Sequence, residues 1–277
     1  HVRCMAQWSG GTNPVVLLGT SRGRMVFWDV RHMREINTLS HPAAHGSIEA
    51  LALDPQRHWV CVGTSNGYVA LWDTRFHVRL QTWRTSNHAR IRACALHPTR
   101  PHVLTVATSA VVSLDLGTGA VLETFYSREF GEHVPNITLE SCADEAPSDT
   151  CWDGSYALCV GADGYMSSPA ESPRGWIVTG GSDRVVRFWD LGRADTCTAF
   201  GSQIHGEFTM THHRYIHTFQ CIEAPPKRSP LHIHQQVKDA MGTLTSHQDT
   251  ITALAVIEAP YRCVVAGDRS GVLCVWE

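Results

Sequence analysis

Three features common in other protein classes are missing from this 277-residue sequence: a long apolar run, a strong charge of one sign, and paired cysteines. Its longest apolar runs, such as Pro14–Leu18, fall far short of the roughly 18 residues that a membrane-spanning helix needs. The net charge of −3, from 23 Lys and Arg against 26 Asp and Glu, offers no broad basic surface to nucleic acid. Because 43% of the residues are hydrophobic, we expect a globular chain with a sizeable core.

None of the ten cysteines belongs to a Cys-x-x-Cys pair. Cys61, Cys94, Cys263 and Cys274 lie inside apolar runs, where a free thiol packs as a small hydrophobe. A disulfide framework is unusual in a chain with this much core material, so a reducing, cytoplasmic compartment is favoured. The chain begins at His1 with no initiator Met and no signal-like segment, and we interpret it as a piece of a longer protein.

An apolar run that ends in an aromatic–acid pair recurs along the chain. The pairs are Trp28-Asp29, Trp72-Asp73, Trp189-Asp190 and Trp276-Glu277, with a weaker copy at Leu114-Asp115. The anchors at 28, 72 and 114 are 44 and 42 residues apart, within the period of roughly 40–45 residues that marks a WD repeat. Shorter apolar runs bounded by Gly or Pro flank each anchor and are typical of strands. Four antiparallel strands per repeat form one blade of a β-propeller.

We therefore predict an all-β, WD-repeat β-propeller that is incomplete, with about five blades of a larger ring. The predicted blades cover about residues 1–40, 46–84, 90–125, 155–200 and 247–277. Two long loop insertions are expected, an acidic one at about 126–154 and a histidine-rich one at about 201–246. The last blade ends after its third strand, and we expect its outer strand to come from upstream of His1.

The repeat also predicts a structural hydrogen-bond network. In such repeats a Trp of the third strand, a Ser or Thr of the second, an Asp of the turn between them and a His before the first satisfy one another in the core. The expected members are His45, Trp72, Asp183, Trp189, His247 and Trp276. Only Asp183 occupies the turn position fully, and Ser270 replaces the acid in the last repeat. We expect partial networks, since no repeat has all four members.

Two stretches resemble the C-terminal propeller of one family, the large kinase-like regulatory subunit of the class III phosphatidylinositol 3-kinase complex (vacuolar sorting protein fifteen). The first comprises Trp72–Phe76, Ala89–Arg92 and Leu96–Pro98. The second comprises Gly181–Asp183 with Arg187–Leu191. A long insertion and a final blade then follow, as in that family, and the resemblance implies that the complete ring has seven blades.

The resemblance implies a non-enzymatic protein-interaction scaffold that acts in endosomal sorting and autophagy. Its implied partners are the catalytic lipid-kinase subunit and the coiled-coil subunits of the complex. It implies a cytoplasmic protein, peripheral on endosomal or autophagic membranes, that meets the membrane only through the complex. The family's kinase-like domain lies elsewhere in its chain, and this sequence has no glycine-rich nucleotide loop, HRD-like loop or DFG motif. No cofactor, metal or nucleic-acid partner is expected.

Four residues are candidates for partner binding: Arg75, Phe76, Arg90 and Arg92. Arg and aromatic side chains at the edges of blades are favoured as interface anchors. The alternative for the arginines is pairing with acids of the blade itself, such as Asp73.

Two other functions stay open at this point. A generic WD-repeat adaptor of another complex, such as a substrate receptor or peptide reader, would have the same fold. A metal-dependent enzyme would use the histidine-rich insertion, where His213 and His217 are spaced to share one face of a helix. No HExxH motif and no nearby Cys or acid completes a ligand set, so solvated loop histidines are the favoured interpretation.

Overall fold

The structure is a computed structural model of the whole chain. It describes residues 1–8, 14–85, 89–100, 102–107, 111–127, 139–141, 155–161, 175–192, 197–200, 207–212, 215–220, 247–257 and 263–276. Within these residues the regular elements are strands, apart from the short 3-10 helix η1 (Ala43–His45). No helix among them is long and apolar enough to span a bilayer. The predicted all-β class is confirmed.

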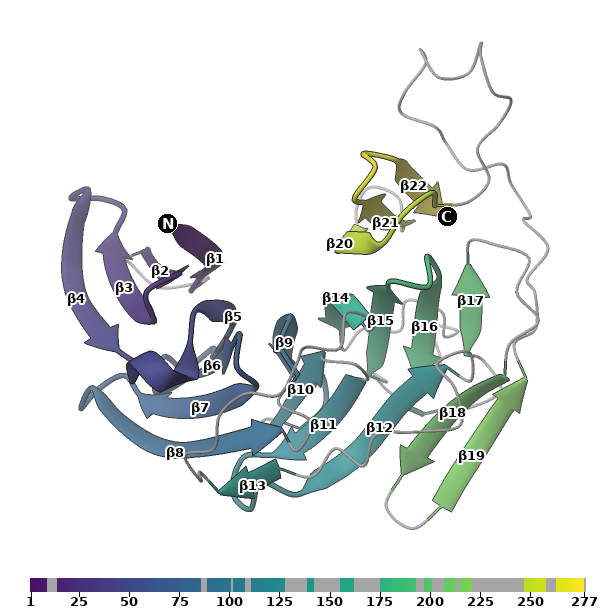
Figure 1. Cartoon of the computed structure of the whole chain (residues 1–277), viewed down its shortest axis with the longest axis horizontal. Helices are drawn as coiled ribbons and strands as arrows, with labels where there is room; N and C mark the ends of the chain where they lie inside the picture. Colours follow the sequence, from purple (N-terminus) through teal and green to yellow (C-terminus); the bar gives the residue numbers. More distant parts are fainter. Residues whose placement is uncertain are drawn as a thin grey trace. The chain divides into compact units, whose positions relative to one another are not determined.

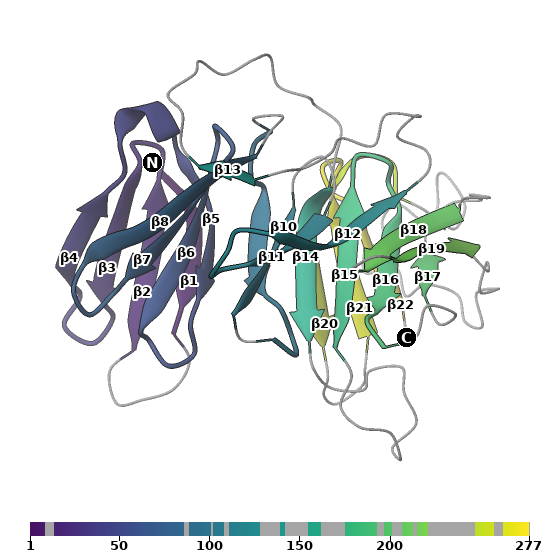
Figure 2. The ribbon, with the colours of Figure 1, turned by 90° about the horizontal axis from the view of Figure 1, so that it is seen from below.

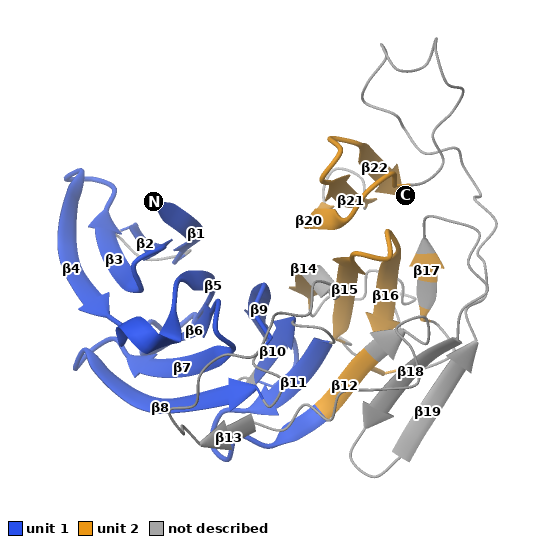
Figure 3. Cartoon of the chain, in the orientation of Figure 1, with its two compact units in different colours: residues 1–122, 135–152 blue, residues 123–134, 153–277 orange. Residues whose placement is uncertain are grey.

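The chain divides into two compact units, which Figure 3 shows in different colours. Unit 1 comprises residues 1–122 and 135–152, and unit 2 comprises residues 123–134 and 153–277.

Unit 1 contains antiparallel sheets whose strands follow one another in chain order (Figure 1). The first sheet consists of β1 (Val2–Gln7), β2 (Val15–Thr20), β3 (Arg24–Asp29) and β4 (Arg34–Ser40). The second consists of β5 (Ile48–Leu53), β6 (Trp59–Thr64), β7 (Tyr68–Asp73) and β8 (Val78–Thr85). The third contains β9 (Ala93–Leu96), β10 (Val103–Ala107), β11 (Val111–Asp115) and the start of β12 (Val121–Ser127). β5–β8 lies beside β1–β4 in Figure 1, and the two sheets overlap in the view from below (Figure 2).

Unit 2 holds two further antiparallel sheets. One consists of β14 (Ser155–Gly161), β15 (Trp176–Gly181), β16 (Val186–Asp190) and β17 (Thr198–Phe200). The other consists of β20 (Ile251–Ile257), β21 (Cys263–Asp268) and β22 (Leu273–Trp276).

Strand register shows that the anchors are equivalent. Each anchor lies in the third strand of its sheet and faces the residue one position into the second strand. The facing pairs are Trp28 with Val16, Trp72 with Val60, Leu114 with Leu104, Trp189 with Ile177 and Trp276 with Val264. The premise of the repeat, equivalent third strands, is thereby confirmed.

Neighbouring sheets pack closely at a repeated glycine. A Cβ atom on Gly63 of β6 would come within 2.3 Å of Ile91, which precedes β9. Gly19 of β2 meets Ile48 of β5 in the same way, and Gly180 of β15 meets Ile251 of β20. These three isoleucines have no exposed surface, although Ile91 lies outside a strand. Since only hydrogen fits at the glycine, an isoleucine of the next repeat seals each junction within a unit.

The insertions depart in part from the expected loops. Leu139–Ser141 of the acidic insertion forms strand β13, which pairs with the end of β8. Glu207–His212 (β18) and Tyr215–Gln220 (β19) form a hairpin that pairs with β12. These segments therefore extend the sheets, because the edge of a sheet offers unpaired backbone groups to a further strand. A further Trp-Asp pair, Trp152-Asp153 in the acidic insertion, and the proline-rich stretch Pro225–Pro230 in the histidine-rich insertion lie outside the described residues.

Candidate interaction surface

The polar network of the second sheet differs from the expected one. Trp72 donates its indole N–H to Nε2 of His41, at 3.0 Å. His45, the expected histidine of this network, stacks on Tyr68 with ring centroids 4.0 Å apart. Burial lowers the pKa of His41 to about 3, with help from nearby His45 and Arg79, so its ring is neutral and accepts through Nε2. The hydrogen bond of the Trp72 indole therefore goes to His41, a residue that the sequence pattern did not indicate.

In the fourth sheet the network follows the expected pattern more closely. Trp189 donates its indole N–H to Oγ1 of Thr179 on β15, at 3.0 Å. Asp183 lies in the turn, as predicted, and forms a buried ion pair with Arg187 of β16. Its Oδ1 also accepts the backbone N–H of Val185 at 3.3 Å. The arginine thus supplies the charge that satisfies this buried acid.

The last sheet builds its network around an acid that sequence reasoning did not single out. His247 lies 3.4 Å from Asp268, and its ring lies 5.6 Å from that of Trp276. Burial opposes ionisation of Asp268, but hydrogen bonds from Ser270, Gln248, Val272 and Asp249 outweigh it and lower its pKa to about 2. Asp268 therefore supplies the carboxylate of this network, which the repeat pattern places at the position of Ser270.

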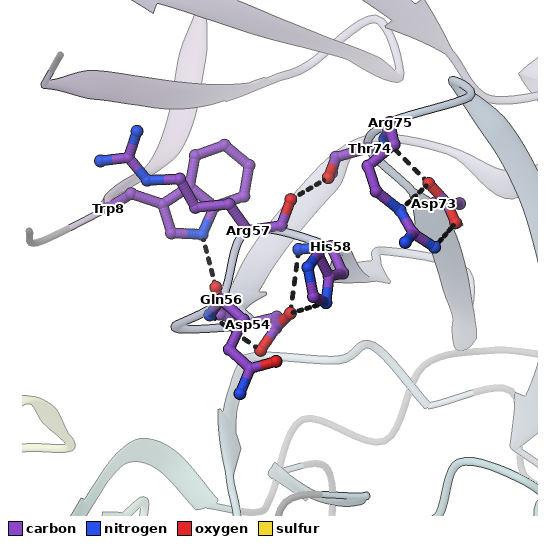
Figure 4. A network of polar contacts seen from close by, with 8 residues as sticks. All are labelled: Trp8, Asp54, Gln56, Arg57, His58, Asp73, Thr74 and Arg75. Atoms are coloured by element: carbon purple, nitrogen blue, oxygen red, sulfur yellow. Dashed lines mark hydrogen bonds and ion pairs between the residues drawn. The ribbon is translucent and has the colours of Figure 1, made fainter. Parts of the chain in front are cut away.

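A second polar cluster joins two turns of the second sheet (Figure 4). Trp8 donates its indole N–H to the backbone oxygen of Asp54 at 2.8 Å, and Arg57 lies 6.0 Å from the Trp8 ring. The Asp54 carboxylate accepts the backbone N–H of His58 at 2.9 Å. Thr74 donates its hydroxyl to the backbone oxygen of Arg57 at 2.6 Å. These bonds tie the β5–β6 turn to the β7–β8 turn.

The β7–β8 turn carries two of the predicted partner-binding residues. Asp73 accepts the backbone N–H groups of Arg75 and Phe76 at 2.8 and 3.2 Å. It also binds the Arg75 guanidinium at 2.7 Å, which lowers the pKa of Asp73 to about 2. The guanidinium lies 5.5 Å from the ring of Phe76, which is 73% exposed. Arg75 does pair with Asp73, as the alternative held, yet the turn still presents Phe76 to solvent.

The β3–β4 turn of the first sheet has the same construction. Asp29 accepts the backbone N–H groups of Arg31 and His32 at 2.9 and 3.2 Å. His32 binds the second oxygen of Asp29 at 2.7 Å, and this hydrogen bond lowers the pKa of Asp29. The two turns are therefore equivalent in structure, and His32 occupies in the first sheet the position of Phe76 in the second.

The other sequence-predicted residues are not brought into one site with Arg75. Arg90 is exposed, while Arg92 is half-buried and donates its backbone N–H to Ala107 at 2.9 Å. His217 lies in strand β19, so the helical face proposed for it with His213 does not form, and His213 is outside the described residues. No group of three His, Cys, Asp or Glu side chains that could hold a metal occurs in the described part of the chain.

Comparison with known proteins bears on the repeat first. The family model described as "WD domain, G-beta repeat" matches residues 34–73 and 172–190. VPS15 serine/threonine-protein kinases are similar over nearly the whole chain: that of Komagataella pastoris is 21% identical over 95% of it, and that of Arabidopsis thaliana 22% over 96%. The Dictyostelium discoideum enzyme is 35% identical over 31% of the chain.

The chain is a WD-repeat region that is similar to part of the VPS15 proteins. It spans 21% of the length of the Komagataella protein, 20% of the Arabidopsis protein and 4% of the Dictyostelium protein. The chain therefore matches only a small part of relatives whose names contain the word kinase. The matched segments contain the Trp72 and Trp189 anchors that the structure places at equivalent positions.

Proposed function

We propose that this VPS15-like region is the non-enzymatic scaffold of a regulatory subunit of a class III phosphatidylinositol 3-kinase complex. It holds the catalytic lipid-kinase subunit and the coiled-coil subunits by protein contacts alone. Through that complex it acts in endosomal sorting and autophagy, in the cytoplasm and at the surface of endosomal or autophagic membranes. The support is the similarity to VPS15 proteins along 95% of the chain, together with a preformed anchor on unit 1.

The β7–β8 turn is that anchor. Its backbone is fixed by Asp73, and Thr74 ties it to the neighbouring turn, so little conformational freedom remains to be lost on binding. Phe76 presents a large apolar surface to solvent, with a guanidinium beside its ring. Exposed aromatic and arginine side chains on a rigid turn are typical of residues that dominate binding energy.

Co-purification of the lipid-kinase subunits with variants of the full protein tests this role. Phe76→Ala removes the aromatic surface but keeps the backbone N–H that Asp73 binds. We expect at least about a tenfold loss of subunit recovery, the size typical of a hot-spot truncation. The charge reversal Arg75→Glu with Arg92→Glu should weaken recovery as well.

His32→Ala is the matched control, because it alters the equivalent turn of the first sheet. It should leave recovery unchanged. Full recovery by a folded Phe76→Ala protein and by the double charge reversal would remove these residues from the interface. Capture of ligase or chromatin subunits in place of a lipid kinase would favour a generic WD-repeat adaptor instead.

A further inference from the structure

The β3–β4 turn of unit 1 and the start of β4 carry three exposed large apolar side chains. Val30 and Met33 lie in the turn and are 41% and 69% exposed. Ile36 lies at the bulge near the start of β4 and is 54% exposed. Because a folded chain gains free energy by burying such groups, three of them within seven residues indicate a contact with something outside the chain.

Met33 has a backbone conformation that disfavours its side chain. Its φ is 49°, in the left-handed region where Gly and Asn are the usual residues. The other non-glycine residues with positive φ in the described part of the chain are Arg57, His77 and Arg184, all of them polar. An apolar side chain held here at a conformational cost is expected where that side chain has a role of its own.

The backbone around Met33 is fixed. Asp29 accepts two backbone N–H groups of the turn at 2.9 and 3.2 Å, and Val30 donates its backbone N–H to Pro14 at 3.3 Å. Strands β3 and β4 pair up to Asp29 and Arg34, on either side of the turn. Met33 is therefore presented on a preorganised turn, and little conformational freedom remains to be lost in a contact.

Two arginines flank Met33 without a carboxylate partner. Arg31 and Arg34 are exposed, and neither forms an ion pair within the described residues. The neighbouring acids are engaged locally, since Asp29 binds the turn and Glu35 accepts a threonine hydroxyl of β4 at 2.6 Å. The turn therefore presents two cations beside an apolar tip.

The equivalent β7–β8 turn differs in both respects. Its Arg75 is bound by Asp73 at 2.7 Å, so that charge is neutralised within the turn. The polar His77 has the left-handed conformation that Met33 has in the first sheet. The combination of an apolar tip at this position with unpaired arginines thus distinguishes the β3–β4 turn from its counterpart.

An anionic lipid bilayer matches the chemistry of the β3–β4 turn. Its interface places negatively charged headgroups above an apolar interior, so Arg31 and Arg34 can meet headgroups while Met33 enters the acyl boundary. A side chain at the tip of a turn has no ring of neighbours to exclude water in a protein interface. Lipid, by contrast, closes around such a tip.

We propose that the β3–β4 turn is a membrane-contact site, which inserts Met33 into bilayers that contain anionic phospholipid and holds them through Arg31 and Arg34. A contact of this size is weak and sensitive to salt, and it adds to other attachments of the protein. The inference goes beyond the proposed function, in which the region reaches the membrane only through the complex.

Vesicle flotation and hydrogen exchange of the full protein test the site. One set of vesicles contains phosphatidylcholine with phosphatidylserine, and the other contains phosphatidylcholine alone. We expect the anionic vesicles to protect the amides of residues 30–36 and the neutral vesicles to leave them unprotected. Added salt should weaken the protection, because it screens the arginines from the headgroups.

Met33→Asn isolates the contribution of the apolar tip. Asn tolerates positive φ, so the turn keeps its conformation while the apolar side chain is lost. We expect the partition coefficient onto anionic vesicles to fall at least about fivefold. Arg31→Gln with Arg34→Gln should lower it about tenfold or more, as expected for the loss of two arginines near an anionic surface.

His77→Asn is the matched control, because it makes the same substitution at the equivalent position of the β7–β8 turn. It should leave the partition coefficient unchanged. Recovery of the lipid-kinase subunits, measured in parallel, should be the same for Met33→Asn and the unmodified protein. Failure of the membrane contact can thus be told apart from failure of the proposed function.

Three results overturn the proposal. One is the absence of protection at residues 30–36 with anionic vesicles. Another is an equal partition coefficient for Met33→Asn and the unmodified protein. The third is protection of residues 30–36 by the lipid-kinase subunits together with poor subunit recovery by Met33→Asn, since the turn would then belong to a protein interface.

Discussion

Trp72 in unit 1 and Trp189 in unit 2 occupy the same place in the strand register but find different hydrogen-bond acceptors. Thr179, three residues into β15, accepts from Trp189 within the same sheet. The equivalent residue of β6 is Val62, which has no acceptor, and Trp72 bonds to His41 instead. A buried indole N–H without an acceptor is costly, so the loss of one partner is compensated by a residue from outside the sheet.

The substitution changes what the hydrogen bond connects. His41 lies in the segment between β4 and β5, and its backbone N–H bonds to Gly23 in the β2–β3 turn at 2.8 Å. The Trp72–His41 bond therefore fastens the second sheet to the first. The Trp189–Thr179 bond fastens only strands of one sheet. The tryptophan at this position of the repeat thus links two sheets in unit 1, whereas in unit 2 it links two strands of one sheet.

The largest expected effect comes from removing each acceptor in turn. His41→Ala leaves the indole of Trp72 unsatisfied and opens a cavity, so we expect a loss of about 3 kcal/mol in the opening free energy of β7. Thr179→Val keeps the volume and should cost about 1–3 kcal/mol in β16. Hydrogen exchange of the full protein, resolved by peptide, measures both. His41→Ala should also loosen β3 and β4, whereas Thr179→Val should leave β20 and β21 unchanged.

His45→Ala serves as the control for the first variant. It removes the stacking on Tyr68 but no acceptor of Trp72, and we expect about 1 kcal/mol. A larger loss from His45→Ala than from His41→Ala would reverse the assignment of the network.

Much of the fold was predictable because the spacing of the apolar runs and their Trp anchors reveals the repeat and its strands. The anchors at Trp28, Trp72, Trp189 and Trp276 define third strands, and the structure places them in equivalent register. Asp183 was predictable by its spacing from Trp189, but its partner Arg187 was not, since spacing along a chain does not reveal which charge faces a turn.

The network residues His41 and Asp268 escaped prediction for a related reason. A neutral histidine can accept from an indole wherever the connecting segment brings it within reach, so the apolar pattern does not indicate that His41 is the acceptor of Trp72. Asp268 lies two residues before the expected turn position, which Ser270 occupies. Its closeness to Ser270 in the sequence could have indicated that it supplies the acid of the network. Strands β13, β18 and β19 depend on pairing with distant edges, which local periodicity does not encode.

Acidification should lower the stability of unit 1 more than that of unit 2. The expected change in free energy lies between those of the other predictions. The pKa of His41 is about 3 in the folded chain and about 6.5 when unfolded, so only the unfolded chain takes up the proton just below pH 6.5. Stability is then complete above pH 6.5 and falls by about 1.4 kcal/mol per pH unit as the pH drops toward 3. Hydrogen exchange of β7 between pH 7 and 5, corrected for intrinsic rates, measures the slope.

Replacement of His41 isolates its contribution from those of other histidines. His41→Gln retains a side-chain acceptor that does not titrate, and the slope in β7 should largely disappear. In unit 2, burial lowers the pKa of His247 but Asp268 opposes the shift, so the acid slope of β21 should be shallower. An equal slope in β7 for the Gln variant and the unmodified protein would exclude His41 as the titrating group.

The smallest expected change in stability comes from a substitution that gives unit 1 the hydroxyl acceptor of unit 2. It is also the most direct test of the comparison between Trp72 and Trp189. Val62→Thr places a hydroxyl at the position equivalent to Thr179. Alone it should destabilise β7 by about 1 kcal/mol, because Trp72 already has an acceptor and the buried hydroxyl gains no hydrogen bond from its indole. In the His41→Ala background the new hydroxyl can accept from Trp72. The double-mutant cycle should then show a favourable coupling of about 1 kcal/mol between the two sites. Strict additivity would mean that the two indoles are oriented differently despite their shared register, and that Thr179 and His41 are not alternative solutions to one problem.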